Sequence, residues 1–190
     1  MRVIAGKARR LNLITPKGED TRPTTDRVKE TLFNILQPSL YGCRFLDLFA
    51  GSGAIGIEAL SRGAKEAVFV DSGRDAQNCI KQNLAHTKLA PQGKLMECDV
   101  FTAIRKLSDK PTFDVVFMDP PYDTDLIYRV LDAIKDTDIV DQDTLIVAES
   151  NLEKDFSFAD ELGYEIIREK EYKTNKHIFI TLKDFGGRQA

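Results

Sequence analysis

Strand-like and helix-like segments alternate along most of this chain, and this alternation restricts the fold more than any other feature. Short runs rich in β-branched and aromatic residues are each followed by a longer amphipathic stretch. Such alternation predicts a parallel sheet that is covered by helices on both faces. We expect strands at 44–49, 67–70, 94–98, 113–118 and 144–148, and helices from the glycine-rich turn to residue 62 and at 75–86, 101–107, 125–134 and 156–162.

Both ends of the chain depart from this alternation. The last two expected strands, near 165–172 and 177–182, are joined by a link so short that they must be antiparallel. One edge of an otherwise parallel sheet is therefore antiparallel. The first 20 or so residues predict extended or hairpin structure with a turn at Pro16-Lys17-Gly18. A helix should follow, capped by Thr24 or Thr25 and ended by Pro38. We therefore expect an N-terminal basic arm with its helix at 1–38 and a single domain at 39–190.

The charge of the chain is unevenly distributed. Residues 1–30 carry eight Lys and Arg against four Asp and Glu, a balance of +4, whereas the remaining 19 against 26 give −7. A basic arm on an acidic body indicates that a polyanion would bind at one end of the molecule. The expected phosphate contacts are Arg2, Lys7, Arg9, Arg10, Arg22 and Arg27.

Other features exclude several classes of protein. No apolar run is long enough to cross a membrane, and the N-terminus lacks the apolar segment of a signal peptide. The three cysteines are far apart and lack zinc-ligand spacing, so they are expected to be buried thiols in a reducing compartment. We expect a cytoplasmic, metal-free monomer.

The segment after the first expected strand contains the pattern G-x-G-x-x-G at Gly51, Gly53 and Gly56. The pattern alone is weak, but here it follows a strand and opens a helix. Asp71 lies 20 residues past Gly51, at the end of the next expected strand, where a carboxylate can accept hydrogen bonds from a ribose diol. An adenosine-containing cofactor is therefore expected. Ser72 and Asp75 are spaced as a capping box for the helix that follows.

Asp47 distinguishes between the possible cofactors. It ends the first expected strand, four residues before Gly51, where a carboxylate would repel a pyrophosphate and attract an ammonium group. S-adenosylmethionine carries an ammonium, a sulfonium and no phosphate, so Asp47 favours it over NAD. Asp99 ends the third expected strand, where it either accepts a hydrogen bond from the adenine amino group or caps the following helix. The expected cofactor contacts are Asp47, Phe49, Gly51, Ser52, Gly53, Asp71, Ser72, Asp99 and Val100.

The fourth expected strand runs into Asp119-Pro120-Pro121-Tyr122. Two prolines could simply end the strand, but an acid and an aromatic ring bracket them at the ligand edge. The amino group of a base is a poor nucleophile because its lone pair is delocalised into the ring. The Asp119 carboxylate and the Pro120 carbonyl can accept its two hydrogens and so orient and polarise it, while Tyr122 offers a face on which the base stacks. We expect Asp119, Pro120 and Tyr122 to be catalytic, with Tyr122 also binding the substrate.

The glycine turn and this tetrapeptide together resemble class I methyltransferases that act on amino nitrogens. The whole chain, including Arg22-Pro23-Thr24-Thr25-Asp26-Arg27-Val28-Lys29-Glu30, is similar to the bacterial RsmD family. This resemblance implies a seven-stranded sheet of order 3-2-1-4-5-7-6 with the last strand antiparallel. It also implies S-adenosylmethionine as the cofactor, S-adenosylhomocysteine as the product, and N2 of a guanine in 16S ribosomal RNA as the target. The substrate is either naked RNA or an assembled small subunit.

Two other functions remain open. A DNA adenine-N6 or cytosine-N4 methyltransferase shares the tetrapeptide, although this chain has no room for an added region that reads DNA sequence. A non-catalytic RNA-binding module is disfavoured by intact Asp119 and Tyr122. His86 and His177 are expected at surface or edge positions rather than as general bases. The core is expected to contain Phe33, Phe45, Phe69 and Phe117.

Overall fold

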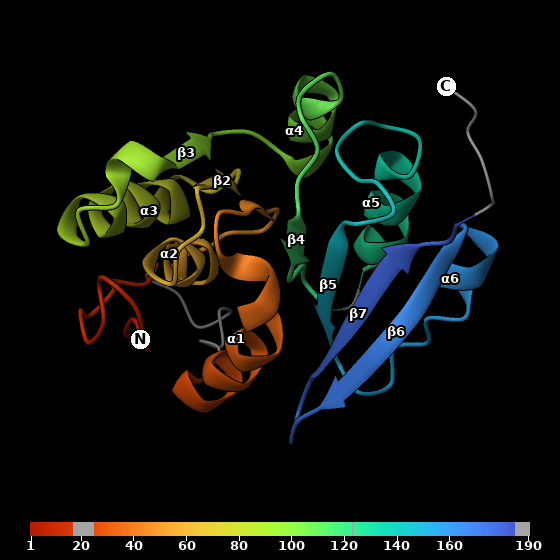
Figure 1. The fold of residues 1–190 in the computed structure, drawn as a ribbon, viewed down its shortest axis with the longest axis horizontal. Coiled ribbons are helices and arrows are strands. Elements are labelled where there is room, and N and C mark those ends of the chain that lie inside the picture. The colour runs from red at the N-terminus through yellow and green to blue at the C-terminus, as the bar shows by residue number, and fades with distance from the viewer. Residues whose placement is uncertain (17–24, 123, 185–190) are drawn as a thin grey trace.

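A computed structural model describes residues 1–16, 25–122 and 124–184 of the chain (Figure 1). Arg22 and the expected turn at Lys17-Gly18 lie outside these residues. The helices are α1 (Asp26–Leu40), α2 (Ala54–Ser61), α3 (Arg74–His86), a short 3₁₀ helix (Ala90–Gln92), α4 (Val100–Leu107), α5 (Leu126–Ile134) and α6 (Phe158–Glu161). The strands are β1 (Arg44–Asp47), β2 (Glu66–Val70), β3 (Gly93–Met96), β4 (Val115–Met118), β5 (Leu145–Ser150), β6 (Tyr164–Glu171) and β7 (Lys176–Leu182).

These strands form one seven-stranded sheet in the order β3-β2-β1-β4-β5-β7-β6, which confirms the expected order. Figure 1 shows the sheet fanning from β3 on the left to the blue β6–β7 hairpin on the right. Strands β1 to β5 pair in parallel, whereas β7 is antiparallel to both β5 and β6. Lys176, the first residue of β7, pairs with Ser150, the last residue of β5. The link between β6 and β7 therefore lies at the same edge of the sheet as the carboxyl ends of the parallel strands.

Helices cover both faces of the sheet and create two apolar layers. On one face, α1, α2 and α3 pack against alternate strand residues such as Phe45, Phe69 and Phe117. On the other face, α4 and α5 pack against the residues between them, such as Leu46 and Val116. Strands buried on both faces explain the continuous apolar runs of the sequence, and all four expected core phenylalanines are buried.

The N-terminal arm shares the first of these layers. Val3, Ala8 and Leu13 are buried in the same cluster as α1 and α2, and the antiparallel bridge Arg2–Asn12 confirms a hairpin at the start of the chain. The buried Glu58 of α2 accepts hydrogen bonds from two backbone N–H groups of the arm, at 2.8 and 3.0 Å. Burial lowers the pKa of Lys29, and the nearby Glu58 carboxylate, 3.2 Å from its Nζ, raises it. Because the arm packs with the sheet, the division at residue 38 stays a prediction.

Three expectations about local structure are wrong. Pro38 lies inside α1, which continues to the buried Leu40, because proline so near a helix end removes few internal hydrogen bonds. Thr25 does cap α1, because its hydroxyl accepts from the Val28 N–H.

Ser72 does not cap α3. The N-cap is Gly73, and no side chain of the described residues forms a capping hydrogen bond there. His177 is fully buried in β7, which lies between β5 and β6, instead of lying at the surface or at an edge, whereas His86 is exposed as expected.

Candidate active site

An acidic side chain lies near the carboxyl end of every parallel strand of the sheet. The carboxyl ends of parallel strands meet at one edge, so these acids lie along the edge where a ligand crevice is expected. The residues are Asp47, Asp71, Asp99, Asp119 and Glu149. A crevice of this charge suits a cationic ligand.

The glycine turn between β1 and α2 has the backbone shape that the pattern requires. Gly51 and Gly53 have φ angles of +53° and +75°, a region that favours glycine. A Cβ on Gly56 would come within 2.3 Å of the Phe69 ring, so the third glycine allows α2 to pack closely on β2. The turn therefore brings backbone close to the crevice at the start of α2.

The Asp71 carboxylate is held in a fixed position beside this turn. Its Oδ2 accepts from the Gly51 N–H and its Oδ1 from the Gly73 N–H, both at 2.8 Å. Each carboxylate oxygen can accept a further hydrogen bond. Asp71 is therefore held in an orientation in which it can accept from two further hydroxyls, as the predicted ribose contact requires.

Asp47 is buried with only half of its carboxylate satisfied. Its Oδ2 accepts from the Gly56 N–H at 3.1 Å, whereas Oδ1 is buried without a hydrogen-bond partner among the described residues. Burial raises the pKa of Asp47 to about 7, and the charge of Asp71 adds to the rise, although the Gly56 hydrogen bond opposes it. A buried carboxylate oxygen of this kind fits the ammonium group of S-adenosylmethionine.

A cleft of about 230 Å³ lies between these strand ends and α4. Leu48, Val70 and Phe101 contribute apolar surface, and Asp71 contributes a carboxylate. Apolar walls with a ribose acceptor suit an adenosine group. The expected cofactor residues that line this cleft are Phe49, Asp71, Ser72, Asp99 and Val100.

Asp99 caps α4. Its Oδ1 accepts from the Thr102 N–H at 3.0 Å and its Oδ2 from the Thr102 hydroxyl at 2.7 Å, and these bonds lower the pKa of Asp99. The capping alternative is thus confirmed, while a contact with adenine stays a prediction because Asp99 also lines the cleft.

The tetrapeptide lies at the same edge, directly after β4. Asp119 is half-buried, and Tyr122 is 38% exposed with its hydroxyl donating to Glu149 Oε1 at 3.0 Å. Burial raises the pKa of Asp119 well above its usual range, and the negative charges of Glu149 and Asp47 raise it further. The structure therefore brings Asp119, Tyr122 and Asp47 together.

Sequence reasoning missed Glu149, Asn175 and His177, which lie behind Tyr122. Glu149 lies one residue before the carboxyl end of β5, so the rule that selected the acids at the other strand ends also applied to it. Its partners Asn175 and His177 come from the β6–β7 link and β7, and only the strand pairing reveals them.

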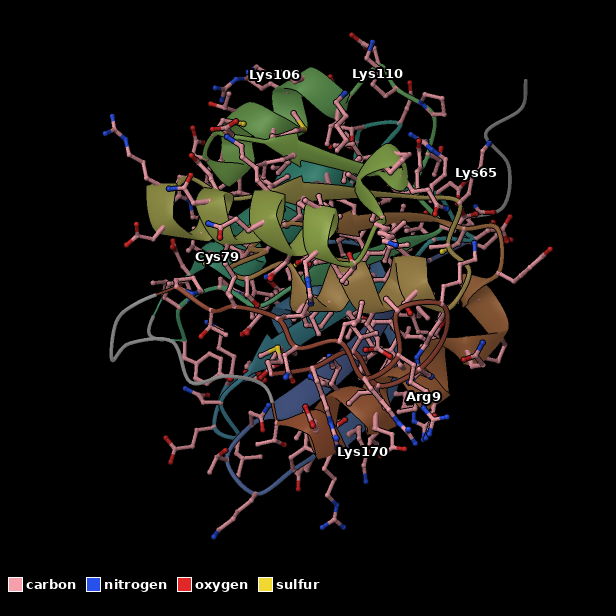
Figure 2. The ribbon with its side chains drawn as sticks, turned by 90° about the vertical axis from the view of Figure 1, so that its left-hand side faces the viewer. Arg9, Lys65, Cys79, Lys106, Lys110 and Lys170 are labelled. Carbon is pink, nitrogen blue, oxygen red and sulfur yellow. The ribbon has the colours of Figure 1, made fainter. Side chains whose placement is uncertain are left out.

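The basic residues of the arm do not gather at the crevice. The Lys7 N–H donates to the carbonyl of Ser61, the last residue of α2, whereas the crevice faces the start of that helix. Eight helical residues span about 12 Å. Figure 2 shows Arg9 on the same side as Lys65, which directly precedes β2, so both lie toward the edge where strands begin. Lys7 and Arg9 therefore lie away from the crevice.

The other arm cations lie near the start of α1. Arg2 is exposed, and its Nε is 2.7 Å from the Asp26 carboxylate; Arg27 is also exposed. Whether any of these residues contacts RNA stays a prediction.

The part of the chain that the structure describes contains no cluster of three or more His, Cys, Asp or Glu that could hold a metal ion. None of the helices within it is long and apolar enough to cross a membrane.

This fold and this crevice together define a Rossmann-like methyltransferase that uses S-adenosylmethionine. The family model "Conserved hypothetical protein 95" matches residues 1–181, so the chain belongs to that family. The ribosomal RNA small subunit methyltransferase D of Haemophilus influenzae is 36% identical over 171 residues, which are 90% of this chain and 88% of that protein. This relative confirms the resemblance to the RsmD family.

Two further relatives agree with this assignment. The Bacillus subtilis protein YlbH is 40% identical over 154 residues, 80% of this chain and 84% of its own length. The solved structure of yhhF from Escherichia coli superposes with a TM-score of 0.80 at 32% identity, covering 96% of this chain and 98% of that one.

Proposed function

We propose that this protein transfers a methyl group from S-adenosylmethionine to N2 of a guanine in small-subunit, 16S ribosomal RNA. The observation that carries the proposal is the position of Asp119: it is half-buried after β4, with Tyr122 beside it and Asp47 close enough to raise its pKa. The carboxyl edge of the sheet thus combines a hydrogen-bond acceptor, an aromatic face and a carboxylate for the cofactor's ammonium.

The chain's own residues have distinct roles in this reaction. The bound cofactor supplies an electrophilic methyl group on a sulfonium. Asp71 accepts the ribose hydroxyls, and Asp47 attracts the ammonium. The Asp119 carboxylate and the Pro120 carbonyl accept the two hydrogens of the target amine, which orients its nitrogen and increases its electron density. No strong base is needed, because the amine nitrogen becomes acidic once it is methylated, and the proton then leaves to water.

The base must leave its stack to reach these acceptors, and the exposed ring of Tyr122 offers it a new surface. The RNA specificity is supported by the relative named ribosomal RNA small subunit methyltransferase D. The described residues form one sheet with its covering helices and no separate region for reading DNA sequence, which disfavours a DNA methyltransferase.

Finer features belong to the same proposal. We propose that the protein acts as a cytoplasmic monomer without a metal, and its free cysteines are compatible with a reducing compartment. The exposed basic residues of the arm and of the first turn of α1 would contact RNA phosphates at a distance from the target nucleotide.

A transfer assay with a labelled methyl group tests the proposal. Naked 16S ribosomal RNA, assembled small subunits and duplex DNA are each incubated with the protein and labelled S-adenosylmethionine. We expect incorporation into one of the two RNA substrates and none with Asp119→Ala. Incorporation into DNA alone, or into no substrate, would overturn the proposal.

A further inference from the structure

The network behind Tyr122 includes an almost fully buried carboxylate. Glu149 is the penultimate residue of β5 and only 3% of its surface is exposed. Nothing in the transfer reaction described above requires it. Glutamate is almost never buried without partners, because desolvating its charge is costly. The hydrogen-bond partners of Glu149 therefore indicate the role of this buried carboxylate.

Three donors from three different segments converge on this carboxylate. Oε1 accepts from the Tyr122 hydroxyl at 3.0 Å and from Asn175 Nδ2 at 2.6 Å. Oε2 lies 2.9 Å from Nε2 of the fully buried His177, whose Nδ1 is 3.1 Å from the Tyr172 hydroxyl. Neutral His177 with its proton on Nε2 satisfies every group: Tyr172 donates to Nδ1, and Nε2 donates to Glu149. An anionic Glu149 accepts all three donors.

The network joins the β6–β7 hairpin to the catalytic tetrapeptide. His177 is the cross-strand partner of Glu149, and Asn175 belongs to the link between β6 and β7. Tyr122 is the member that lies in the tetrapeptide, and its ring remains partly exposed. The network therefore fixes the hydroxyl of Tyr122 on its buried side and leaves the exposed part of the ring available to a base.

Asp119 and Glu149 directly follow Met118 and Ala148, which pair between β4 and β5, so the two acids occupy neighbouring positions and Glu149 also acts on Asp119 through its charge. After burial, the Glu149 carboxylate is the largest cause that raises the pKa of Asp119, ahead of Asp47. The titratable and charged groups around the pair are Asp47 from β1, Tyr122 from the tetrapeptide, Tyr172 from the β6–β7 link and His177 from β7.

We propose that Glu149 is a positioning residue of the methyl-transfer reaction: it holds Tyr122 for stacking of the target base, and it places a negative charge beside the Asp119 acceptor. A protonated Asp119 has lost much of its acceptor capacity, so the acid limb of the rate profile follows Asp119. This inference rests on the proposed function.

Two variants separate the two roles of Glu149. Tyr122→Phe removes the hydroxyl that donates to Glu149 but keeps the ring and every charge. We expect kcat/KM to fall about tenfold, because hydrogen bonds to charged groups are among the stronger ones, with the acid limb unmoved.

Glu149→Gln keeps an acceptor for Tyr122 but removes the charge. We expect its acid limb to move about one pH unit lower. Glu165→Gln, an exposed position near the far end of β6, is the matched control and should behave as the wild type.

A second measurement is independent of activity and of the RNA substrate. Carbon-detected NMR of the Asp119 carboxyl group, in the full protein, should show its titration at lower pH in Glu149→Gln and unchanged in Tyr122→Phe and Glu165→Gln. An unchanged Asp119 titration in a folded Glu149→Gln protein overturns the electrostatic role. Wild-type kcat/KM in Tyr122→Phe overturns the positioning role. Absence of methyl transfer by the wild type counts against the proposed function instead, while the NMR result still decides the electrostatic role.

Discussion

Replacing Asp47 by asparagine should stabilise the cofactor-free protein at neutral and alkaline pH. Burial raises the pKa of Asp47 from 3.8 to about 7, whereas the unfolded chain keeps a value of about 3.9. A folded-state pKa above the unfolded one means that stability is fully present below the unfolded value and is lost as pH rises through the folded value. A shift of about three units corresponds to a loss of about 4 kcal/mol in the free energy of unfolding once pH exceeds 7.

The Asp47→Asn variant would avoid this loss at a smaller cost. The side-chain oxygen of the asparagine can still accept from the Gly56 N–H, but an amide NH₂ would replace the unpartnered Oδ1. A buried donor without a partner costs about 1–3 kcal/mol. The net gain at pH 8 is therefore about 1–3 kcal/mol, whereas near pH 4 the variant should be about 1–3 kcal/mol less stable than the wild type.

Urea unfolding of both proteins without cofactor, at several pH values between 4 and 8, measures this difference. The same substitution should weaken S-adenosylmethionine binding about tenfold or more by calorimetry, because the ammonium loses a charged partner. A difference in stability that stays constant from pH 4 to pH 8 would refute the reasoning. It would show that the pKa of Asp47 is the same in the folded and unfolded states.

Three further variants test other parts of the account. Asp119→Ala should reduce methyl transfer about a hundredfold or more at unchanged cofactor affinity, because its acceptor acts on the target amine; near-wild-type turnover would contradict this. Asp71→Ala should weaken S-adenosylmethionine binding, since charge-assisted hydrogen bonds contribute about 1.5–3 kcal/mol each, with kcat at saturation less affected. An unchanged dissociation constant by calorimetry would remove Asp71 from the site. Replacing four arm cations by Ala should lower the slope of log affinity against log salt by roughly three while cofactor binding stays the same, and a wild-type slope would exclude the arm as a phosphate contact. These four residues are Arg2, Lys7, Arg9 and Arg10.

Local patterns predicted the site wherever chemistry and turn geometry fall within a short stretch of chain. The glycine turn, Asp47 and Asp71 were found in this way, because a G-x-G-x-x-G turn needs left-handed glycines at Gly51 and Gly53, which the structure shows. The strand order was expected from the resemblance to the RsmD family and is confirmed.

Features that depend on distant segments were not predictable. His177 looks like an edge residue in the sequence because its link is polar, but the pairing of β7 with β5 buries it against Glu149. The fixed position of the arm depends on Glu58, whose burial inside α2 has no signal in the sequence. The sequence also could not show that α1 continues past Pro38. Leu40 lies two residues further on, and the burial of its side chain favours the continuation of the helix.

The identity of the methylated nucleoside tests the central claim most directly. Ribosomal RNA from small subunits, treated with S-adenosylmethionine and either the wild-type protein or Asp119→Ala, is digested to nucleosides and analysed by mass spectrometry. We predict N2-methylguanosine with the wild type and none above background with the variant. Methylation of adenine N6 or cytosine N4, or equal N2-methylguanosine from the variant, would contradict the account.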